Sequence, residues 1–461
     1  MKNKSKLFTE FETVSKQAWK QKIQVDLKGA DYNEALLWES PEGIMVKPFY
    51  NREDLLNVPL NSYNRKKNWQ VGELIVTETI EEAYSRSLEA VKGGTETLIF
   101  SINNGDINMP LLLKKIEPLK VSAHFVLQKN PNEILNKTPE LLEKTDKNFI
   151  FHLDVIGNFA STGNWFISQQ DDLVAIADLQ KKSNLNFPIT INSALYQNAG
   201  ANMVQQLAYS MAHANEYLHY LDQQNVLNSD SQITFMVAQG GNYFFEIAKI
   251  RALRILWRTL SKVYNIEENC QIIAHPSKRN KTLYDYNVNL LRTTTECMSA
   301  ILGGADIIYN QPYDALYHKS NDFAERIGRN QLLILKEESY FDLVDNPADG
   351  AYYIESLTVQ LAEKALQLFK QLEKGGGFLK NLKAHSIQKK IKESDAKEKE
   401  LFTVAKEVLV GSNKYPNASD KMKTNLELNP FSKKKVRQTK IEPIIPSRLA
   451  ATLEQNRLNH E

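Results

Sequence analysis

The chain is 461 residues long, which is enough for one large domain with extensions or for two or three smaller domains. Apolar residues make up 42% and charged residues 24%, and the net charge of +2 argues against an extended basic surface for nucleic acid or an anionic membrane. Cys270 and Cys297 are the only cysteines and lack CxxC spacing, which argues against a disulfide framework or a zinc ribbon. No apolar run is long enough to span a membrane, and the N-terminus lacks an apolar signal core, so we expect a cytoplasmic protein.

The first segment, residues 1–60, shows few strong periods. Residues 14–23 are predicted to form a short helix and residues 44–55 an extended arm. Large apolar side chains are frequent here but lack the periodicity of a core: Phe8, Phe11, Trp19, Leu36, Leu37, Trp38, Phe49 and Tyr50. Aromatic residues on an extended segment commonly anchor interfaces, so we expect this arm to contact another subunit. The alternative is that it folds back onto its own chain.

From about Thr97 onwards, short β-branched or apolar runs alternate with segments of helical period. The predicted strands are 97–102, 121–127, 149–156, 188–194, 232–239, 271–277 and 306–312; the predicted helices include 203–221, 243–264, 286–306, 323–341 and 353–377. Apolar strands without alternation are typical of a parallel sheet covered by helices on both faces. Seven such units, with an eighth strand expected within 341–352, favour an α/β fold of the (β/α)8 TIM-barrel type.

The composition changes after Gly377 to a stretch rich in Lys and Glu, followed by Asn, Pro and Lys. This pattern predicts a packed, helical tail. We therefore divide the chain into an N-terminal arm (1–60), a barrel (61–377) and a C-terminal tail (378–461).

Polar side chains near the ends of predicted strands are the candidates for a site. His152 and Asp154 lie two apart on the third predicted strand, so they share one face. A hydrogen-bonded core pair is the favoured interpretation and catalysis the alternative. His275 ends the sixth predicted strand, where a general base could act. These residues do not make a complete catalytic constellation.

Four further features have a structural interpretation that we favour. Gly240 and Gly241 follow a strand and open a helix, so their N–H groups could hold an anion, but a turn or cap is favoured. His213 and His219 lie six apart on a helix and do not share a face well, which argues against a metal site. We expect Cys297 to pack in the core and Glu296 to contact backbone.

The segment from Arg292 to Ala365 resembles methylmalonyl-CoA mutase. It contains, in order, Arg-Thr-Thr, Leu-Gly-Gly, Asp-Phe-Ala-x-Arg-Ile-x-Arg-Asn, Glu-Glu-Ser and Pro-x-x-Gly-x-Tyr-Tyr-x-Glu. Residues 242–257 resemble the family's Asn-x-x-x-Glu-Ile-Ala-Lys helix, and residues 14–50 resemble its N-terminal arm. The resemblance covers most of the chain, and it implies a barrel preceded by an arm that helps to hold two subunits together.

The chemistry implied by this resemblance is the radical interconversion of (R)-methylmalonyl-CoA and succinyl-CoA, with adenosylcobalamin as the radical source and CoA threaded along the barrel axis. Active chains carry Tyr-His-x-Gln-Glu-Ala-Gly-Ala after the fourth strand. In this sequence Leu195 stands in place of the His and Asn198 in place of the Glu. A leucine can neither donate a hydrogen bond nor transfer a proton. The comparison therefore implies no catalytic, cofactor-binding or metal-binding residue in this chain.

Two other departures from the family have consequences. The sequence contains no Asp-x-His-x-x-Gly, the cobalt-ligand motif of the family's cobalamin-binding flavodoxin-like domain, and we expect that domain to be absent. Residues 68–84 also differ from the family's substrate-holding Arg-Gln-Tyr-Ala-Gly-Phe segment. We therefore expect a small (beta) subunit of a heterodimeric mutase, whose larger alpha subunit binds the adenosylcobalamin; a homodimer could form without that partner. A barrel released from binding CoA can fill its axis, and the residues expected to do so are Phe100, His124, His152 and Phe235.

Two alternatives remain open. The chain could be the catalytic barrel of a split acyl-CoA mutase whose cobalamin domain is a separate chain, although Leu195 and residues 68–84 argue against this. It could instead be an unrelated barrel enzyme using His275, His152 and Asp154, which the resemblance makes a weaker hypothesis.

Overall fold

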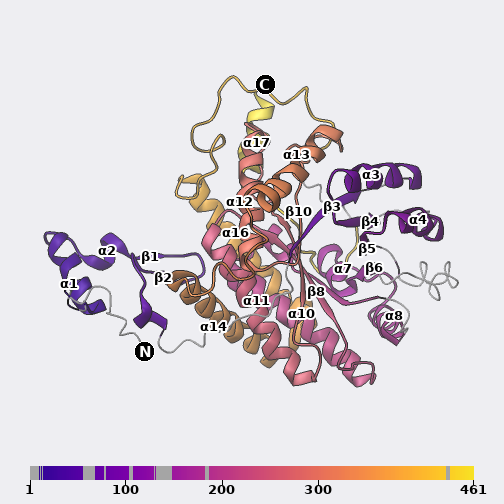
Figure 1. Cartoon of the computed structure of the whole chain (residues 1–461), viewed down its shortest axis with the longest axis horizontal. Helices are drawn as coiled ribbons and strands as arrows, with labels where there is room; N and C mark the ends of the chain where they lie inside the picture. Colours follow the sequence, from indigo (N-terminus) through magenta and orange to yellow (C-terminus); the bar gives the residue numbers. More distant parts are fainter. Residues whose placement is uncertain are drawn as a thin grey trace, which may run out of the picture.

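The centre of the molecule is an eight-stranded parallel sheet surrounded by helices (Figure 1). A computed structural model of the chain describes residues 10, 12, 14–55, 68–76, 79–102, 107–128, 130, 148–181, 186–431 and 437–461. The strand order is β6-β5-β4-β3-β10-β9-β8-β7, and the end strands β6 and β7 approach each other to give a nearly closed (β/α)8 barrel. The strands are β3 (Gln70–Val76), β4 (Thr97–Ile102), β5 (Ser122–Leu127), β6 (Phe149–Leu153), β7 (Ile189–Asn192), β8 (Ile233–Gln239), β9 (Gln271–Pro276) and β10 (Ile307–Tyr309).

Helices cover the outside of this barrel. They are α3 (Ile80–Lys92), α4 (Met109–Ile116), α7 (Val155–Thr162), α8 (Gln169–Lys181), α9 (Ala194–Asn198), α10 (Met203–Gln223), α11 (Tyr243–Tyr264), α12 (Val288–Gly303), α13 (Asp322–Leu333) and α14 (Tyr352–Lys374), with short helical turns η2 (Glu117–Leu119) and η3 (Ile334–Glu338). The start of α10 illustrates how they are set: Asn202 and Gln205 form a capping box, each side chain accepting from the other's backbone N–H. No helix in the described part of the chain combines the length and apolar character needed to cross a bilayer.

The predicted barrel is confirmed, but the predicted place of its eighth strand is wrong. Residues 341–352 contain turns and no strand. The missing strand is β3, which pairs with β10 on one side and β4 on the other, so it is the first strand of the barrel. Gly72 and Glu73 interrupt its apolar pattern. Gly72 is there because a Cβ would lie 3.1 Å from Ile307, and Glu73 is held by Arg329 at 2.6 Å.

Alternation along the strands decides which side chains fill the barrel. Ile99, Ile273 and Ile307 pack together in the interior and are at most 2% exposed. Phe100 is the neighbour of Ile99 and therefore points outwards, into the cluster that the surrounding helices cover. Phe235 also points outwards and meets Trp257 of α11 edge-on at 5.8 Å. The prediction that these two phenylalanines fill the axis is therefore wrong.

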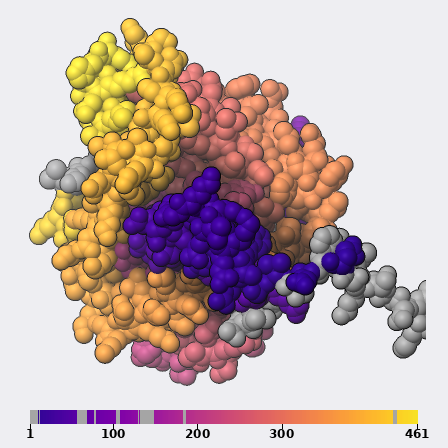
Figure 2. Space-filling model, turned by 90° about the vertical axis from the view of Figure 1, so that its left-hand side faces the viewer, coloured from indigo at the N-terminus to yellow at the C-terminus, as the bar shows by residue number. Residues whose placement is uncertain are grey.

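The N-terminal arm has two parts that behave differently (Figures 1 and 2). It comprises α1 (Lys16–Asp26), α2 (Tyr32–Leu36), the hairpin β1 (Trp38–Glu39) and β2 (Met45–Val46), and η1 (Arg52–Leu55). The hairpin packs on its own barrel: Ile44 is buried, and Trp38 meets Phe245 of α11 edge-on at 5.9 Å. By contrast, α1 buries none of its residues. The arm thus folds back in its second half only; Phe8 and Phe11 lie outside the described residues.

The tail is helical only in part. It contains α15 (Gly377–Lys383), α16 (Ser386–Thr403) and α17 (Ala451–Asn459), and the described residues between α16 and α17 form no helix. Residues 437–449, which we call the strap, run across the carboxyl end of the barrel. The strap donates backbone hydrogen bonds to Ala160, Asn198 and Arg279, which follow β6, β7 and β9. It therefore covers one sector of the end where barrel enzymes place their catalytic groups.

Candidate functional site

The loop after β7 holds the two positions at which the sequence departs from the active family pattern. Leu195 is 7% exposed and belongs to the main apolar core. The next residue, Tyr196, is fully buried, and its hydroxyl lies 2.9 Å from Nδ1 of His213. At the position of the implied catalytic histidine, the chain therefore places an apolar side chain that stabilises the core.

Asn198 connects the loop after β7 to the loop after β9 and to the strap. Its Oδ1 accepts hydrogen bonds from Ser277 Oγ and from the backbone nitrogen of Lys278, both at 3.0 Å, and its backbone oxygen accepts from Ser447 of the strap. Gly200, at φ +97°, is equally enclosed, because a Cβ there would lie 2.7 Å from Cβ of Asp395 in α16. This loop is thus covered by the chain's own tail.

Asp154 lies just after β6 and caps the start of α7. Its Oδ1 accepts from Gly157 N (2.7 Å), Tyr217 Oη (2.9 Å) and His213 Nε2 (3.0 Å), and its Oδ2 accepts from Asn192 N (2.8 Å). Burial alone would raise the pKa of Asp154, but His213 and the N–H donors outweigh burial and lower it. The carboxylate therefore stays ionised, and both of its oxygens accept hydrogen bonds.

Two histidines form a hydrogen-bonded chain inside the barrel. His124 Nδ1 lies 2.8 Å from His152 Nε2, and His152 Nδ1 lies 2.9 Å from Thr190 Oγ1. Because Thr190 donates its own hydroxyl proton to Pro188 O, it must accept from His152, which in turn accepts from His124. Burial lowers the pKa of His124 to about 3, and burial and His124 lower that of His152. Both rings are therefore neutral at pH 7.

His152 and Asp154 close the seam between the two end strands. The backbone pairing between β6 and β7 is reduced to a bridge between Ile150 and Asn186. Further along the seam, His152 bonds the Thr190 side chain and Asp154 bonds the Asn192 backbone. Side-chain bonds thus replace part of the ladder, which is a structural role for both residues.

His275 lies in a separate polar group, on the β9–β10 side of the barrel. Its Nδ1 is 2.9 Å from Pro276 O and 3.2 Å from Gln311 Nε2, and its ring stacks on Tyr309 at 4.9 Å. Burial lowers its pKa to about 4. The structure therefore does not bring His275 together with His152 and Asp154 into one constellation.

Two buried ion pairs at the carboxyl end were missed by the sequence analysis. Lys249 contacts Glu246 at 2.5 Å within α11, and Lys281 contacts Glu296 at 2.7 Å. Glu246 also accepts the Gly240 N–H at 2.8 Å, so the anion at this glycine turn is the chain's own carboxylate. The expectation of a backbone contact for Glu296 is wrong, because Lys281 and Asn280 bind it instead. The i, i+3 spacing of Glu246 and Lys249 was the available signal.

The two cysteines and the two histidines of α10 lie in surroundings that indicate structural roles. Cys270 and Cys297 are buried, and burial raises the pKa of both thiols, that of Cys270 to about 12. They are therefore protonated and poor nucleophiles. His213 is buried against Asp154, whereas His219 lies exposed beside Gln223, as expected for two histidines that do not share a helix face.

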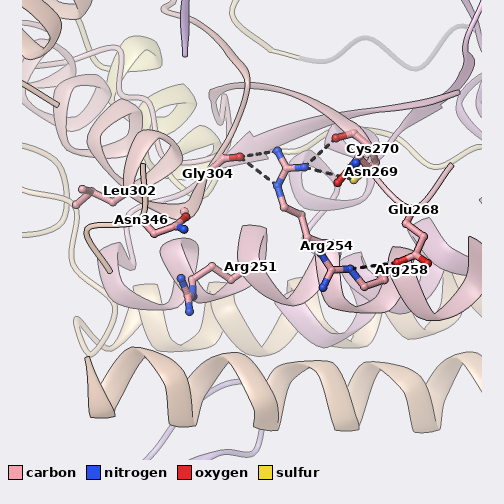
Figure 3. Close-up of a pocket in the computed structure, with 10 residues that line it drawn as sticks. Arg251, Arg254, Arg258, Glu268, Asn269, Cys270, Leu302, Gly304 and Asn346 are labelled. Carbon is pink, nitrogen blue, oxygen red and sulfur yellow. Dashed lines mark hydrogen bonds and ion pairs between the residues drawn. The ribbon is translucent and has the colours of Figure 1, made fainter. Parts of the chain in front are cut away.

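A small pocket, partly open to solvent, lies at the opposite end of the barrel (Figure 3). Three arginines of α11 approach it. Arg254 bonds Cys270 O, Gly304 O and Asp306, Arg251 pairs with Asp349 and Glu355, and Arg258 pairs with Glu268. Each guanidinium is matched by a carboxylate, so the pocket has no excess positive charge for an anionic ligand.

Comparisons with known proteins agree with one family. The family described as methylmalonyl-CoA mutase matches residues 143–458. A methylmalonyl-CoA mutase small subunit from Porphyromonas gingivalis is 33% identical over 91% of this chain and 72% of its own length. A methylmalonyl-CoA mutase from Cereibacter sphaeroides is 28% identical, over 87% of this chain and 64% of its own length, so the chain spans less than two thirds of that relative. A small subunit from Streptomyces virginiae is 26% identical over 85% of this chain and 67% of its own.

Proposed function

The chain belongs to the methylmalonyl-CoA mutase family, and we propose that it serves there as a small, non-catalytic subunit. In this proposal the heterodimer interconverts (R)-methylmalonyl-CoA and succinyl-CoA, and a larger subunit carries the reaction. The observation that carries the proposal is the state of the loop after β7: Leu195 is buried in the core, and Asn198 is bonded to the tail.

The interior of the barrel supports the same conclusion. If CoA threads along the axis in active members, the axis must leave room for it. Here Ile99, Ile273 and Ile307 pack against one another in the interior, and the bonded pair His124 and His152 occupies the β5–β6 side with no exposed surface. Replacing these contacts with a ligand would require a rearrangement of a close-packed core.

The sector of the carboxyl end that follows β7 leaves no open face for the corrin of adenosylcobalamin. A corrin needs a broad open face at this end, but the loop after β7 is covered by Ser447 of the strap and by Asp395 of α16. Arg279 fixes that cover through Asp395, Glu398 and Ser447. We therefore assign the cofactor to the partner and derive no step of the reaction through this chain.

The arm supplies a surface for the partner. Val14, Trp19 and Val25 are 72%, 48% and 71% exposed on or beside α1, which buries no residue of its own. Exposed apolar side chains on a projecting segment are the usual material of subunit interfaces. Two relatives named as small subunits imply a larger partner for those proteins, and the proposal extends this to the present chain.

The test is co-expression with a cobalamin-bearing mutase chain, followed by size exclusion and isomerase assays of each chain alone and of the pair. We expect a stable heterodimer with activity, no activity from this chain alone, and no cobalamin in its preparation. The same experiment is repeated with a truncated chain that lacks residues 1–50. This truncated chain should remain folded by circular dichroism and should fail to co-purify with the larger subunit.

Isomerase activity of this chain with a separate cobalamin-binding domain would overturn the non-catalytic assignment. It would favour the alternative, the catalytic barrel of a split acyl-CoA mutase. Co-purification of the truncated chain at full activity would instead overturn the role of the arm.

A further inference from the structure

We propose that the larger subunit covers a belt of apolar side chains that runs from the arm to the outer face of α12. This inference rests on the proposed function, because it names the surface of the barrel that the homologous partner contacts in addition to the arm. The belt comprises Leu291, Thr295, Met298 and Leu302 of α12, Leu343 and Val344 before α14, Phe244 of α11 and Tyr352 of α14.

The outer face of α12 exposes apolar groups without an accompanying charge. Leu291 is 68% exposed, and Thr295 is exposed one turn further on. The helix has only two charged residues, and both are bonded within the chain: Arg292 donates to Val410 O at 2.6 Å, and Glu296 is buried in its ion pair. Depletion of charged residues distinguishes the centre of an interface from the rest of a protein surface.

The threonines of α12 make this face still less polar. Thr294 Oγ1 donates to Leu290 O at 2.8 Å, and Thr295 Oγ1 donates to Arg292 O at 2.9 Å. A hydroxyl bonded to its own helix leaves the methyl group as the part of Thr295 that a partner meets.

The outer face of α8 provides the contrast. Its exposed residues are Asp171, Val174, Asp178 and Lys181, so a single apolar side chain lies among charges there. Figure 1 places α8 on the other side of the barrel from the arm. The low polarity of α12 is therefore not a general property of the helices that surround this barrel.

Apolar contacts connect α12 to the arm. Leu302 and Tyr243 of α11 pack against the same buried cluster. The neighbour of Tyr243 is Phe244, whose ring lies 5.5 Å from that of Tyr353, and Tyr353 in turn lies 5.1 Å from Tyr50 of the arm. Figure 2 shows salmon and orange segments around the indigo arm on the same face. The belt is thus continuous with the surface already assigned to the partner.

The segment before α14 widens this surface. Figure 3 shows Leu302 beside Asn346, and Leu343 and Val344 shortly precede Asn346 in the chain. These two side chains are 71% and 60% exposed, and Tyr352 is 41% exposed at the start of α14. Exposed apolar side chains gathered in this way mark an interaction site rather than ordinary surface.

The area that a stable pair needs favours the larger subunit as the occupant. The helix α1 has 11 residues, so it is about 16 Å long and one of its faces offers roughly 250 Å². A permanent heterodimer buries more than ~2,000 Å² in total, or about 1,000 Å² on each subunit. The arm helix alone is too small for this, and the belt supplies adjoining apolar surface.

The experiment measures binding of the full-length chain to the purified larger subunit by titration calorimetry. The variants are Leu291→Glu, Thr295→Glu, Thr295→Val and the control Val174→Glu, which changes an exposed residue of α8. We expect Leu291→Glu and Thr295→Glu to weaken binding at least tenfold, because each places a charge in an apolar contact. Thr295→Val and Val174→Glu should bind like the wild type. Hydrogen exchange should show residues 288–302 protected in the complex and residues 169–181 unchanged.

The outcomes separate this inference from the proposed function. If the wild type binds and both belt variants bind equally well, the belt is not the contact, whereas the subunit role stands. Equal weakening by Val174→Glu, or no added protection of residues 288–302, would also overturn the belt. If the wild type itself does not bind the larger subunit, both proposals fall. Light scattering of the isolated chain tests the remaining occupant: a homodimer that Leu291→Glu dissociates, with heterodimer affinity unchanged, would assign the belt to a second copy and overturn the inference. Circular dichroism confirms that each variant is folded.

Discussion

The backbone oxygen of Asn198 accepts a hydrogen bond of 2.8 Å from the backbone nitrogen of Ser447. This bond joins the loop after β7 to the strap, and Arg279 reinforces it by donating to Ser447 O at 2.9 Å and pairing with Asp395 at 2.8 Å. A loop that resembles the catalytic loop of a mutase is therefore a structural joint between barrel and tail. We therefore expect substitutions in this loop to change the stability of the protein, so both stability and activity should be measured.

The first prediction concerns Arg279. Replacing it by glutamine leaves the partly buried Asp395 with one partner fewer, so we expect a loss of about 3 kcal/mol of unfolding free energy and faster amide exchange in residues 437–449. Urea unfolding and hydrogen exchange check these outcomes. The control is Arg437→Gln, because exposed Arg437 bonds Thr162 O at the other end of the strap. Equal effects of the two substitutions would show that Arg279 does not fix the strap.

The second prediction concerns Leu195. Restoring the family's residues with Leu195→His and Asn198→Glu together should yield no isomerase activity in the isolated chain, because the axis stays filled and groups that act together recover little singly. Leu195→His alone should lose roughly 2–4 kcal/mol of stability by placing an imidazole in the core. Leu195→Met, of similar volume, should lose less than about 1.5 kcal/mol. Turnover by the double variant without a partner would contradict the proposal.

Acid should destabilise the barrel through its histidine pair. The folded-state pKa of His124 is about 3, while an unfolded histidine titrates near 6.5. Between these values the unfolded state binds the proton first, so stability is present above pH 6.5 and falls as the pH is lowered. The slope is about 1.4 kcal/mol per pH unit for one histidine.

Urea unfolding from pH 7 to pH 4 measures this slope. His124→Gln should reduce it by about one proton, whereas His219→Gln, at an exposed position, should leave it unchanged. If both variants keep the wild-type slope, the acid sensitivity has another origin.

Much of the fold follows from local patterns. The predicted strand 97–102 is β4, and the predicted helix 203–221 is α10, because each has a strong period and clear end signals. The strand β3 was missed because Gly72 and Glu73 break its apolar run, and both are explained by contacts with distant residues. The proline and glycine in residues 341–352 indicated that this segment forms turns rather than a strand.

The hydrogen-bond partners of the candidate residues could not be predicted from the sequence. His152 and Asp154 bond to Thr190, Asn192 and His213, which are far away in the sequence. Periodicity places a residue on a face, whereas it does not tell which side chain of another element will meet it. For the same reason Phe100 and His124, adjacent in the sheet, were assigned to the same axis although they point to opposite faces.

The last prediction concerns the exposed helix of the arm. Val25 is 71% exposed on α1, so Val25→Glu should change the free energy of unfolding by less than about 0.5 kcal/mol. If α1 is the subunit contact, the same substitution places a charge in an apolar interface and should weaken binding to the larger subunit at least tenfold, about 1.4 kcal/mol. Val263→Glu is the matched control, because Val263 is also 71% exposed. Val263 lies near the end of α11, whereas the arm contacts the start of that helix, where Trp38 packs against Phe245. Titration calorimetry with the purified larger subunit measures both affinities. Equal affinities for the two variants would exclude α1 from the interface.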